Sequence, residues 1–261
     1  MIKSTEIKRI ILIGNRSFIQ QNLHFFFKKK YKVVKIKFEN VKKSLFFDND
    51  VIINCSQDKR FFSKKYNKLY DRNYLIARLL GNKNINFVLL SSRSVYSPKF
   101  SLKENSNLSL TNRYGINCFK SEQNCKKLIK KLTILRISNV VGLEYGKKKR
   151  PSLMSIMING IKKKRIVFDM NFYWYKDLIP VNILSQYIYK IITLKYFGII
   201  NVGSGFKLRV KDFIKYLSLN KKIKIKVIKI KTKTDDYSYN ITKLKKLTKL
   251  YYSKEKIIGE Y

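Results

Sequence analysis

The sequence has few of the residues that define several structural classes. Only 3 cysteines, 3 prolines, 10 glycines and 1 histidine occur among its 261 residues. This composition excludes a disulfide-bonded scaffold, a collagen-like chain and a disordered chain rich in proline and glycine. The cysteines form no Cys-x-x-Cys pair and His24 stands alone. We therefore predict no metal site and no nucleophile activated by histidine.

Acidic residues are also scarce, at 16 against 58 lysines and arginines, which gives a formal net charge of +42. Such a charge attracts nucleic acids, acidic lipids and nucleotide phosphates alike. However, 47 of the basic residues are lysine and no lysine run is longer than three. Lys, Asn, Ile, Phe and Tyr all have A/T-rich codons, so codon usage is the favoured explanation of the charge. Nucleic acid is not an expected partner, because clustered arginines are absent.

Long hydrophobic runs are missing as well. No apolar stretch reaches the roughly 18 residues of a membrane-spanning helix, and the apolar segment near the N-terminus is too short for a secretion signal. The chain is nevertheless 45% hydrophobic, which is enough to form a large core. We therefore expect a folded cytoplasmic protein without a membrane span.

Short apolar segments alternate with amphipathic ones along the first half of the chain. Continuous apolar runs of this length are typical of strands buried on both faces. We expect strands at 10–13, 33–38, 50–54, 87–90 and 132–137, with helices at 18–27, 70–80 and 114–131. This alternation predicts an α/β fold with a doubly wound parallel sheet.

The pattern changes near residue 145. We expect residues 1–145 to form the core and residues 146–261 to form a smaller part packed on it. The smaller part contains a basic loop at 146–151 and a helix expected at 152–160. A strand at 198–202 is expected to rejoin the sheet.

The first strand ends in Gly14. A dinucleotide-binding loop needs glycine where the backbone approaches a pyrophosphate, followed by amides at a helix N-terminus. Ser17 and Gln20 stand at the two later positions where such loops carry glycine. A buried strand that merely ends in glycine is the alternative explanation. The residues expected to hold the cofactor here are Gly14, Arg16, Ser17, Phe18 and Ile19.

Seven short motifs follow one another in order: Asp50–Ser56, Asn73, Phe87–Tyr96, Tyr114–Glu122, Leu135–Gly142, Lys176–Val181 and Gly198–Gly205. Together they resemble the extended short-chain dehydrogenase/reductases, the NAD-dependent epimerase/dehydratase family that modifies nucleotide sugars. The resemblance implies a Rossmann-like core for residues 1–145 and a substrate-binding role for residues 146–261. It also implies hydride transfer between a nicotinamide and a sugar carbon.

The resemblance identifies Ser92 and Tyr114 as catalytic residues, with the tyrosine moving the hydroxyl proton. Members of the family carry a lysine four residues after the tyrosine, which lowers its pKa, whereas this sequence has Cys118. Lys120 lies about 120° away around the helix, so it does not replace that lysine. Tyr114 is therefore expected to keep a pKa near 10. A proton donor survives this change better than a base does.

Further contacts follow from the same resemblance. The cofactor is expected to contact Asn54, Cys55, Ser56, Asn73 and Cys118. The substrate is expected to contact Ser94, Asn139, Lys176 and Asp177. For Lys176 and Asp177, a surface ion pair is the alternative.

The resemblance implies that the cofactor is NAD(P), and we expect NADP to be favoured over NAD. Lys35 and Lys37 stand where an NAD enzyme usually has an acid, although Glu39 follows. Arg16 suits a 2′-phosphate, because a guanidinium binds phosphate with two parallel hydrogen bonds.

The sequence predicts an NAD(P)-dependent oxidoreductase or epimerase that acts on a nucleotide-activated sugar in polysaccharide biosynthesis. The alternative is a catalytically degenerate protein that still binds NAD(P) or a nucleotide sugar, since the lysine and two loop glycines are missing. The sequence leaves open whether the protein forms a homodimer.

Overall fold

The computed structural model describes residues 7–81, 83–109, 112–142, 157, 160–168, 173–218, 224–227 and 235–260. Its centre is a sheet of six strands, all paired in parallel. In spatial order the strands are β2 (Val33–Ile36), β1 (Ile10–Ile13), β3 (Val51–Asn54), β4 (Asn86–Ser92), β5 (Leu132–Ile137) and β10 (Gly198–Val202). The expected α/β class with a doubly wound parallel sheet is confirmed.

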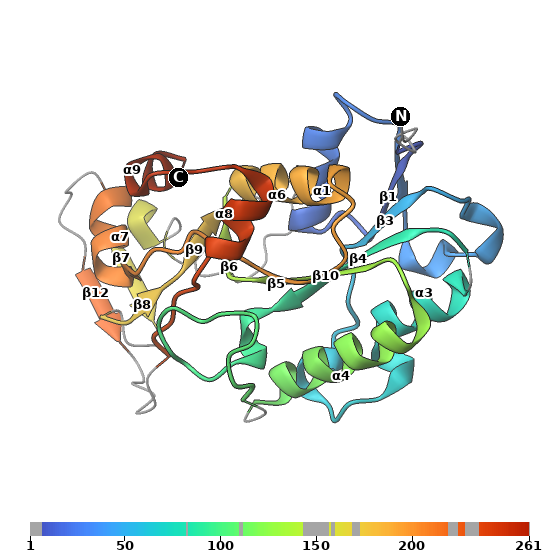
Figure 1. The fold of residues 1–261 in the computed structure, drawn as a ribbon. Coiled ribbons are helices and arrows are strands. Elements are labelled where there is room, and N and C mark those ends of the chain that lie inside the picture. Colours follow the sequence, from blue (N-terminus) through green and yellow to red (C-terminus); the bar gives the residue numbers. More distant parts are fainter. Residues whose placement is uncertain are drawn as a thin grey trace.

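Helices cover both faces of this sheet (Figure 1). One face carries α1 (Phe18–Phe27), α6 (Val181–Thr193) and α8 (Thr242–Thr248). The other carries α3 (Arg72–Leu80) and α4 (Arg113–Leu128). Three of them begin at side chains that accept a backbone N–H of the first turn, namely Ser17, Asp71 and Asn112.

The alternation of side chains along each strand divides the interior into two cores. Ile10 and Leu12 of β1 belong to the core under α1 and α6, and Ile11 and Ile13 to the core over α3 and α4. All four are fully buried. Each such side chain contributes about 1.5–3 kcal/mol to folding, which is why continuous apolar runs form these strands.

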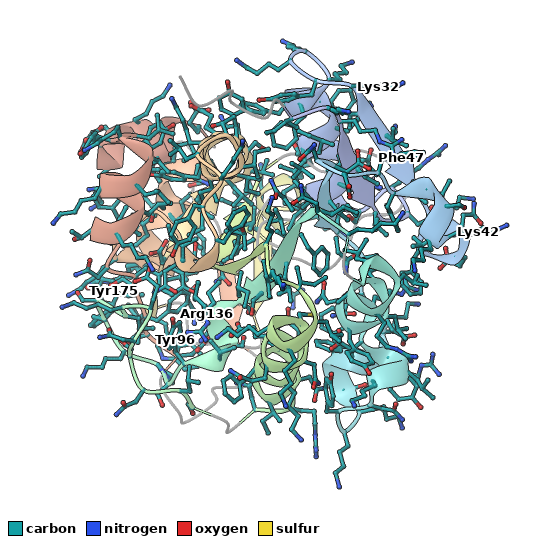
Figure 2. All side chains as sticks on the ribbon, turned by 45° about the vertical axis from the view of Figure 1, so that its right-hand side comes forward. Lys32, Lys42, Phe47, Tyr96, Arg136 and Tyr175 are labelled. Carbon is teal, nitrogen blue, oxygen red and sulfur yellow. The ribbon has the colours of Figure 1, made fainter. Side chains whose placement is uncertain are left out.

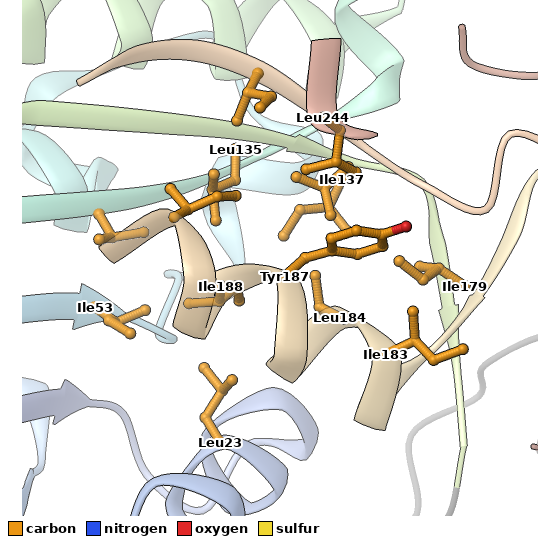
Figure 3. Close-up of a cluster of buried hydrophobic side chains, with 14 of the residues drawn as sticks. Leu23, Ile53, Leu135, Ile137, Ile179, Ile183, Leu184, Tyr187, Ile188 and Leu244 are labelled. Carbon is orange, nitrogen blue, oxygen red and sulfur yellow. The ribbon is translucent and has the colours of Figure 1, made fainter. Parts of the chain in front are cut away.

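Tyr187 of α6 lies in the middle of the larger core. Figure 3 shows its ring among aliphatic side chains of α6, of the sheet and of α8. Leu184 and Ile188 flank it on the same helix, and Leu135 and Leu244 come from β5 and α8. This core joins segments from both halves of the chain, so the sheet and the later elements fold as one packed unit.

The connection from β2 to β3 is short. It contains two single turns, η1 (Phe38–Asn40) and η2 (Lys43–Leu45), instead of an α-helix. Phe46 is fully buried and packs in the smaller core, and Arg9 pairs with the buried Asp50 at 2.7 Å. These contacts close that end of the sheet.

A smaller group of elements lies at the left of Figure 1. It comprises three two-stranded pairs and two helices: β6 (Asn139–Val141) with β9 (Leu178–Pro180), β8 (Tyr175–Lys176) with β11 (Leu208–Arg209), β7 (Arg165–Phe168) with β12 (Lys224–Val227), α7 (Val210–Leu217) and α9 (Lys254–Gly259). The expected boundary at 145/146, the loop at 146–151 and most of the helix at 152–160 lie outside the described residues. β10 pairs with β5 in the main sheet.

Lysine side chains project outward on every visible side of the molecule, as Lys32 and Lys42 do in Figure 2. Tyr96 and Arg136 lie inside. Within the described ranges, no helix combines the length and hydrophobicity needed to cross a membrane.

Candidate functional site

A cavity of about 440 Å³ opens at the carboxyl ends of β4 and β5. Ligands bind at this edge in open parallel sheets. Ser92 from the end of β4, Tyr114 from α4 and Asn139 from β6 lie in its wall. Arg93, Lys176 of β8 and Asp235 contribute the charged groups of the wall. The fold therefore brings four motifs to one place, although 84 positions of sequence separate Ser92 from Lys176.

Ser92, Tyr114 and Cys118 form a hydrogen-bonded row. The phenol of Tyr114 shares side-chain hydrogen bonds with Ser92 and with Cys118. Ser92 also accepts the N–H of Ser94 at 3.2 Å, which closes the single turn η4 (Arg93–Val95). The two expected catalytic residues are thus in direct contact.

Burial raises the pKa of Tyr114 well above 10. The neighbouring thiol raises this pKa further, while the hydrogen bond from Ser92 lowers it. The expectation of an ordinary pKa near 10 is wrong, because the sequence did not reveal how deeply the phenol is buried. Burial also raises the pKa of the Cys118 thiol. Both groups therefore keep their protons at neutral pH.

Two phenylalanines of α2 (Arg60–Ser63) hold the ring of Tyr114. Phe62 stacks on it with ring centroids 5.0 Å apart and an angle of 23°, and Phe61 meets it edge-on at 6.3 Å. Phe62 is half-exposed, whereas Phe61 is buried. Sequence analysis missed both residues, because their only signal is an aromatic pair inside a connecting segment.

The turn η4 and the start of α4 touch at Gly115. A Cβ atom on Gly115 would lie 2.0 Å from the carbonyl oxygen of Ser94. Asn112 donates to the same oxygen at 3.2 Å and accepts the N–H of Gly115 at 2.6 Å. Ser94 is expected to bind substrate. In the structure its carbonyl oxygen contacts the start of α4, and its hydroxyl contacts the hydroxyl of Ser92 at 3.2 Å. This junction sets the distance between Ser92 and Tyr114.

The loop after β1 is built around Gln20, which is buried. Its amide nitrogen donates to the carbonyls of Leu12 and Gly14 at 3.0 Å each, and its oxygen accepts the N–H of Arg16 at 2.8 Å. The side chain fills the space under the loop that a glycine would leave open. Arg16 adopts a left-handed φ of 53° and its side chain is exposed.

The other residues of this loop lie close to the cavity or to the next strand. Ile19 lines the cavity, and Phe18 is buried. Ser17 donates from its hydroxyl to the carbonyl of Cys55 at 2.9 Å. The structure thus brings the loop after β1 and the loop after β3 together.

Asn54 and Asn73, both expected at the cofactor, contact each other. The Asn54 amide donates to the Asn73 oxygen at 2.7 Å, and the Asn54 oxygen accepts from both the N–H and the hydroxyl of Ser56. Asn73 in turn donates to Ser121 of α4 at 3.3 Å. These side chains tie β3, α3 and α4 together under the site.

Lys176 is buried, which contradicts the alternative of a surface ion pair with Asp177. Its ammonium group instead contacts Asp235, at 2.5 Å from a carboxylate oxygen and 2.6 Å from the backbone carbonyl. Arg93 donates to the same carboxylate oxygen at 2.6 Å. Sequence analysis missed Arg93 and Asp235, because no spacing signals a pair 142 residues apart.

Asp177 is fully buried and does not belong to the cavity wall. Its carboxylate accepts the backbone N–H groups of Ser204, Gly205 and Tyr239 and the hydroxyl of Ser204. It therefore orders the turn after β10 and the segment after Asp235.

A second buried network uses three further motif residues. Arg136 forms two hydrogen bonds with Glu122, at 2.7 and 3.1 Å, and donates to the Tyr96 hydroxyl at 2.7 Å. Glu122 also accepts from Ser91 at 2.5 Å. These bonds fix α4 against β4 and β5 behind the cavity, which makes them structural rather than catalytic. No cluster of three or more potential metal ligands occurs among the described residues.

The sequence matches no family model and no curated protein. Solved structures are similar over nearly the whole chain. A UDP-N-acetylglucosamine 4-epimerase from Methanobrevibacter ruminantium M1, in complex with UDP-N-acetylmuramic acid, has a TM-score of 0.85 at 16% identity, covering 98% of this chain and 96% of that one.

Two other solved structures are similar to this chain over nearly its whole length. A UDP-glucuronic acid 4-epimerase from Bacillus cereus in complex with NAD has a TM-score of 0.78 at 17% identity, covering 97% of this chain and 96% of its own. An NAD-dependent NDP-hexosamine 5,6-dehydratase involved in tunicamycin biosynthesis has a TM-score of 0.79 at 16% identity, with coverages of 97% and 96%. The chain therefore has the fold of NAD-dependent nucleotide-sugar epimerases and dehydratases.

Proposed function

We propose that the protein binds NAD(P)H and a nucleotide sugar and reduces a carbonyl group on the sugar, with Tyr114 as the proton donor. The observation that carries the proposal is the hydrogen-bonded pair of Ser92 and Tyr114 in the wall of the cavity. The fold shared with NAD-dependent nucleotide-sugar enzymes supports the choice of cofactor and substrate class. The later part of the chain would hold the sugar, since it contributes Lys176 and Asp235 to the same wall.

The chemistry needs one hydride and one proton. The chemistry that NADPH would supply, if held by the loop from Gly14 to Ser17, is a hydride for the carbonyl carbon, with oxidation to NADP balancing the reduction. Tyr114 gives its phenol proton to the carbonyl oxygen, which becomes the hydroxyl of the product. Ser92 donates to the phenol oxygen and so stabilises the phenolate that remains. Water restores the proton at the end of the cycle.

The same geometry favours reduction over epimerisation. An epimerisation that begins by oxidising a sugar hydroxyl needs a base, and Tyr114 is held in its protonated form. Burial and Cys118 both raise the pKa of this phenol, and Cys118 stands where a lysine would lower it. Tyr114 is therefore suited to donate a proton and poorly suited to remove one.

The residues fit a dinucleotide at the pyrophosphate and adenosine end. The loop between Gly14 and Ser17 leads directly into the N-terminus of α1, where backbone N–H groups favour anions. Beside it, Glu39 pairs with Arg72 at 3.3 Å. The acid that would select NAD is thus partly neutralised by Arg72. Two exposed cations lie in the same part of the chain: Lys35 four residues before Glu39, and Arg16 in the loop after β1. This supports NADP as the cofactor.

The residues fit a dinucleotide less well where its nicotinamide would bind, because Cys118 stands where members of the family that the sequence resembles have a lysine. This observation, with the filled loop at Gln20, favours the second candidate function: a protein that binds NAD(P) or a nucleotide sugar without turnover. The two functions differ in one measurable respect, the consumption of the reduced cofactor.

The test is to titrate the purified protein with NADPH and NADH while following nicotinamide fluorescence, and then to add UDP-4-keto sugars. Reduction requires binding of the cofactor and a fall in absorbance at 340 nm. Tyr114→Phe should lower turnover by about 10²–10⁴-fold without changing cofactor affinity. Tyr251→Phe is the matched control, because Tyr251 is exposed and far along the chain. Cofactor binding with no turnover in the wild type supports the second function.

A further inference from the structure

Two cations and one carboxylate share the wall of the cavity beside the expected reaction centre. Arg93 follows Ser92 directly in the sequence, Lys176 lies on β8, and Asp235 lies on the segment after β12. One oxygen of Asp235 accepts hydrogen bonds from both Arg93 and Lys176. The other described residues that line the cavity carry no charge. The cluster therefore has a net charge of +1.

Aromatic rings hold the two cations in place. The guanidinium of Arg93 lies 4.4 Å above the ring of Tyr237, and the ammonium of Lys176 lies 5.0 Å from the ring of Trp174. The side chains of Arg93 and Lys176 are 18% and 2% exposed, against 32% for Asp235. Both cations have thus lost most of their hydration, and the most exposed member is the carboxylate.

This arrangement leaves one positive charge of the three groups unbalanced at the wall of the cavity. A guanidinium offers five N–H donors, and Asp235 is the one described side chain that accepts from Arg93. The remaining donors can bind a second carboxylate, which would balance two cations with two anions. A desolvated, charge-assisted contact of this kind is stronger than one made at the surface.

We propose that Arg93 and Lys176 form a subsite for a carboxylate on the sugar, so that the substrate is an acidic nucleotide sugar such as a nucleoside diphosphate uronic acid. The inference rests on the proposed function and names its substrate class. Arg93 is assigned to the sugar instead of the diphosphate because it is the neighbour of Ser92, which contacts Tyr114. Asp235 accepts hydrogen bonds from both cations and balances one of their two charges.

The test compares UDP-glucuronic acid with UDP-glucose, which differ only in a carboxylate against a hydroxymethyl group. Affinities are measured by calorimetry at about 0.15 M salt to limit the general attraction of the +42 surface. The wild type should bind the acid at least tenfold more tightly. Arg93→Gln should reduce this preference to within about twofold, because it weakens binding of the acid far more than binding of UDP-glucose. Arg78→Gln on the exposed face of α3 is the control with the same change in charge.

Other outcomes separate the hypotheses. Equal binding of the two ligands by the wild type, or a preference that persists in Arg93→Gln, overturns the subsite and leaves the proposed function intact. An equal loss of both ligands in Arg93→Gln assigns the residue to the diphosphate and also overturns it. If neither ligand binds the wild type, the proposed function fails together with the subsite.

A second variant covers the case in which Arg93→Gln does not fold. Asp235→Asn removes the internal negative charge and keeps a side-chain oxygen that can accept from both cations, while the backbone carbonyl still accepts from Lys176. We expect its preference for the acid to rise at least threefold over the wild type. An unchanged or lower preference contradicts the subsite.

Discussion

The side chains of Tyr114 and Cys118, one helical turn apart on α4, share a hydrogen bond. A lysine at this place would favour the phenolate, whereas the thiol favours the phenol. Two acids, Asp71 and Glu122, also act on Cys118, and their charges raise the pKa of its thiol. The protein thus retains a negative potential around the position, although the cation is missing.

Cys118→Lys should convert Tyr114 from an acid into a group that also serves as a base. The nearby acids stabilise an ammonium at residue 118, and the ammonium lowers the pKa of the phenol. We expect oxidation of the product sugar at pH 8 to increase at least tenfold. The pH–rate profile and the ultraviolet titration of tyrosinate both measure the change. Cys118→Ser adds no charge, and an equal gain in that variant would contradict the explanation.

The buried tyrosines predict a loss of stability at high pH. Burial raises the pKa of Tyr114, Tyr237 and Tyr239 above the value near 10 that they have when unfolded. A group with a raised folded pKa stabilises the protein fully below its unfolded pKa, and this contribution is lost as pH rises further. The free energy of unfolding in urea should therefore fall between about pH 9.5 and 11.

Deprotonation of lysines acts in the opposite direction, because it reduces the repulsion within the +42 chain. Measuring at about 0.5 M salt screens that effect. Stability that stays level over this pH range at high salt would contradict the burial of these phenols.

Gly115→Ala should separate α4 from η4. The added Cβ would lie 2.0 Å from the Ser94 carbonyl oxygen, and a backbone atom cannot move away as the end of a flexible side chain can. Overpacking of this kind costs about 1–3 kcal/mol. It should also abolish turnover, since it moves Tyr114 away from Ser92. Gly259→Ala is the control, because a Cβ there meets nothing within 4 Å.

Arg136→Leu should destabilise the protein by about 3–5 kcal/mol, because it leaves the charge of Glu122 buried without its partner. Urea unfolding followed by circular dichroism measures the loss. The double variant Glu122→Leu/Arg136→Leu removes both charges and should be more stable than the single variant. A double variant that is less stable than either single one would show that the pair contributes more than the avoidance of a lone buried charge.

The sequence predicted the sheet well because its strands are buried on both faces. A continuous apolar run such as residues 10–13 is stable mainly as a strand with both faces covered. The structure that the local pattern predicts is therefore the one that the rest of the fold provides. The short motif around Ser92 and Tyr114 was also visible, because its members lie at fixed distances along a strand and a helix. By contrast, Phe62 and Gln20 act through space without any periodic pattern, and the sequence did not point to them.

The sequence by itself determined the α/β class, and its short motifs were enough to show the family resemblance that made Ser92 and Tyr114 the expected catalytic residues. Apolar periodicity and short spacings depend only on neighbours along the chain, so they can be read without coordinates. Only the tertiary structure decided that burial raises the pKa of Tyr114, that Asp177 orders loops and that Asp235 joins Arg93 to Lys176. These properties depend on burial and on contacts between distant segments, and both arise only when the chain packs.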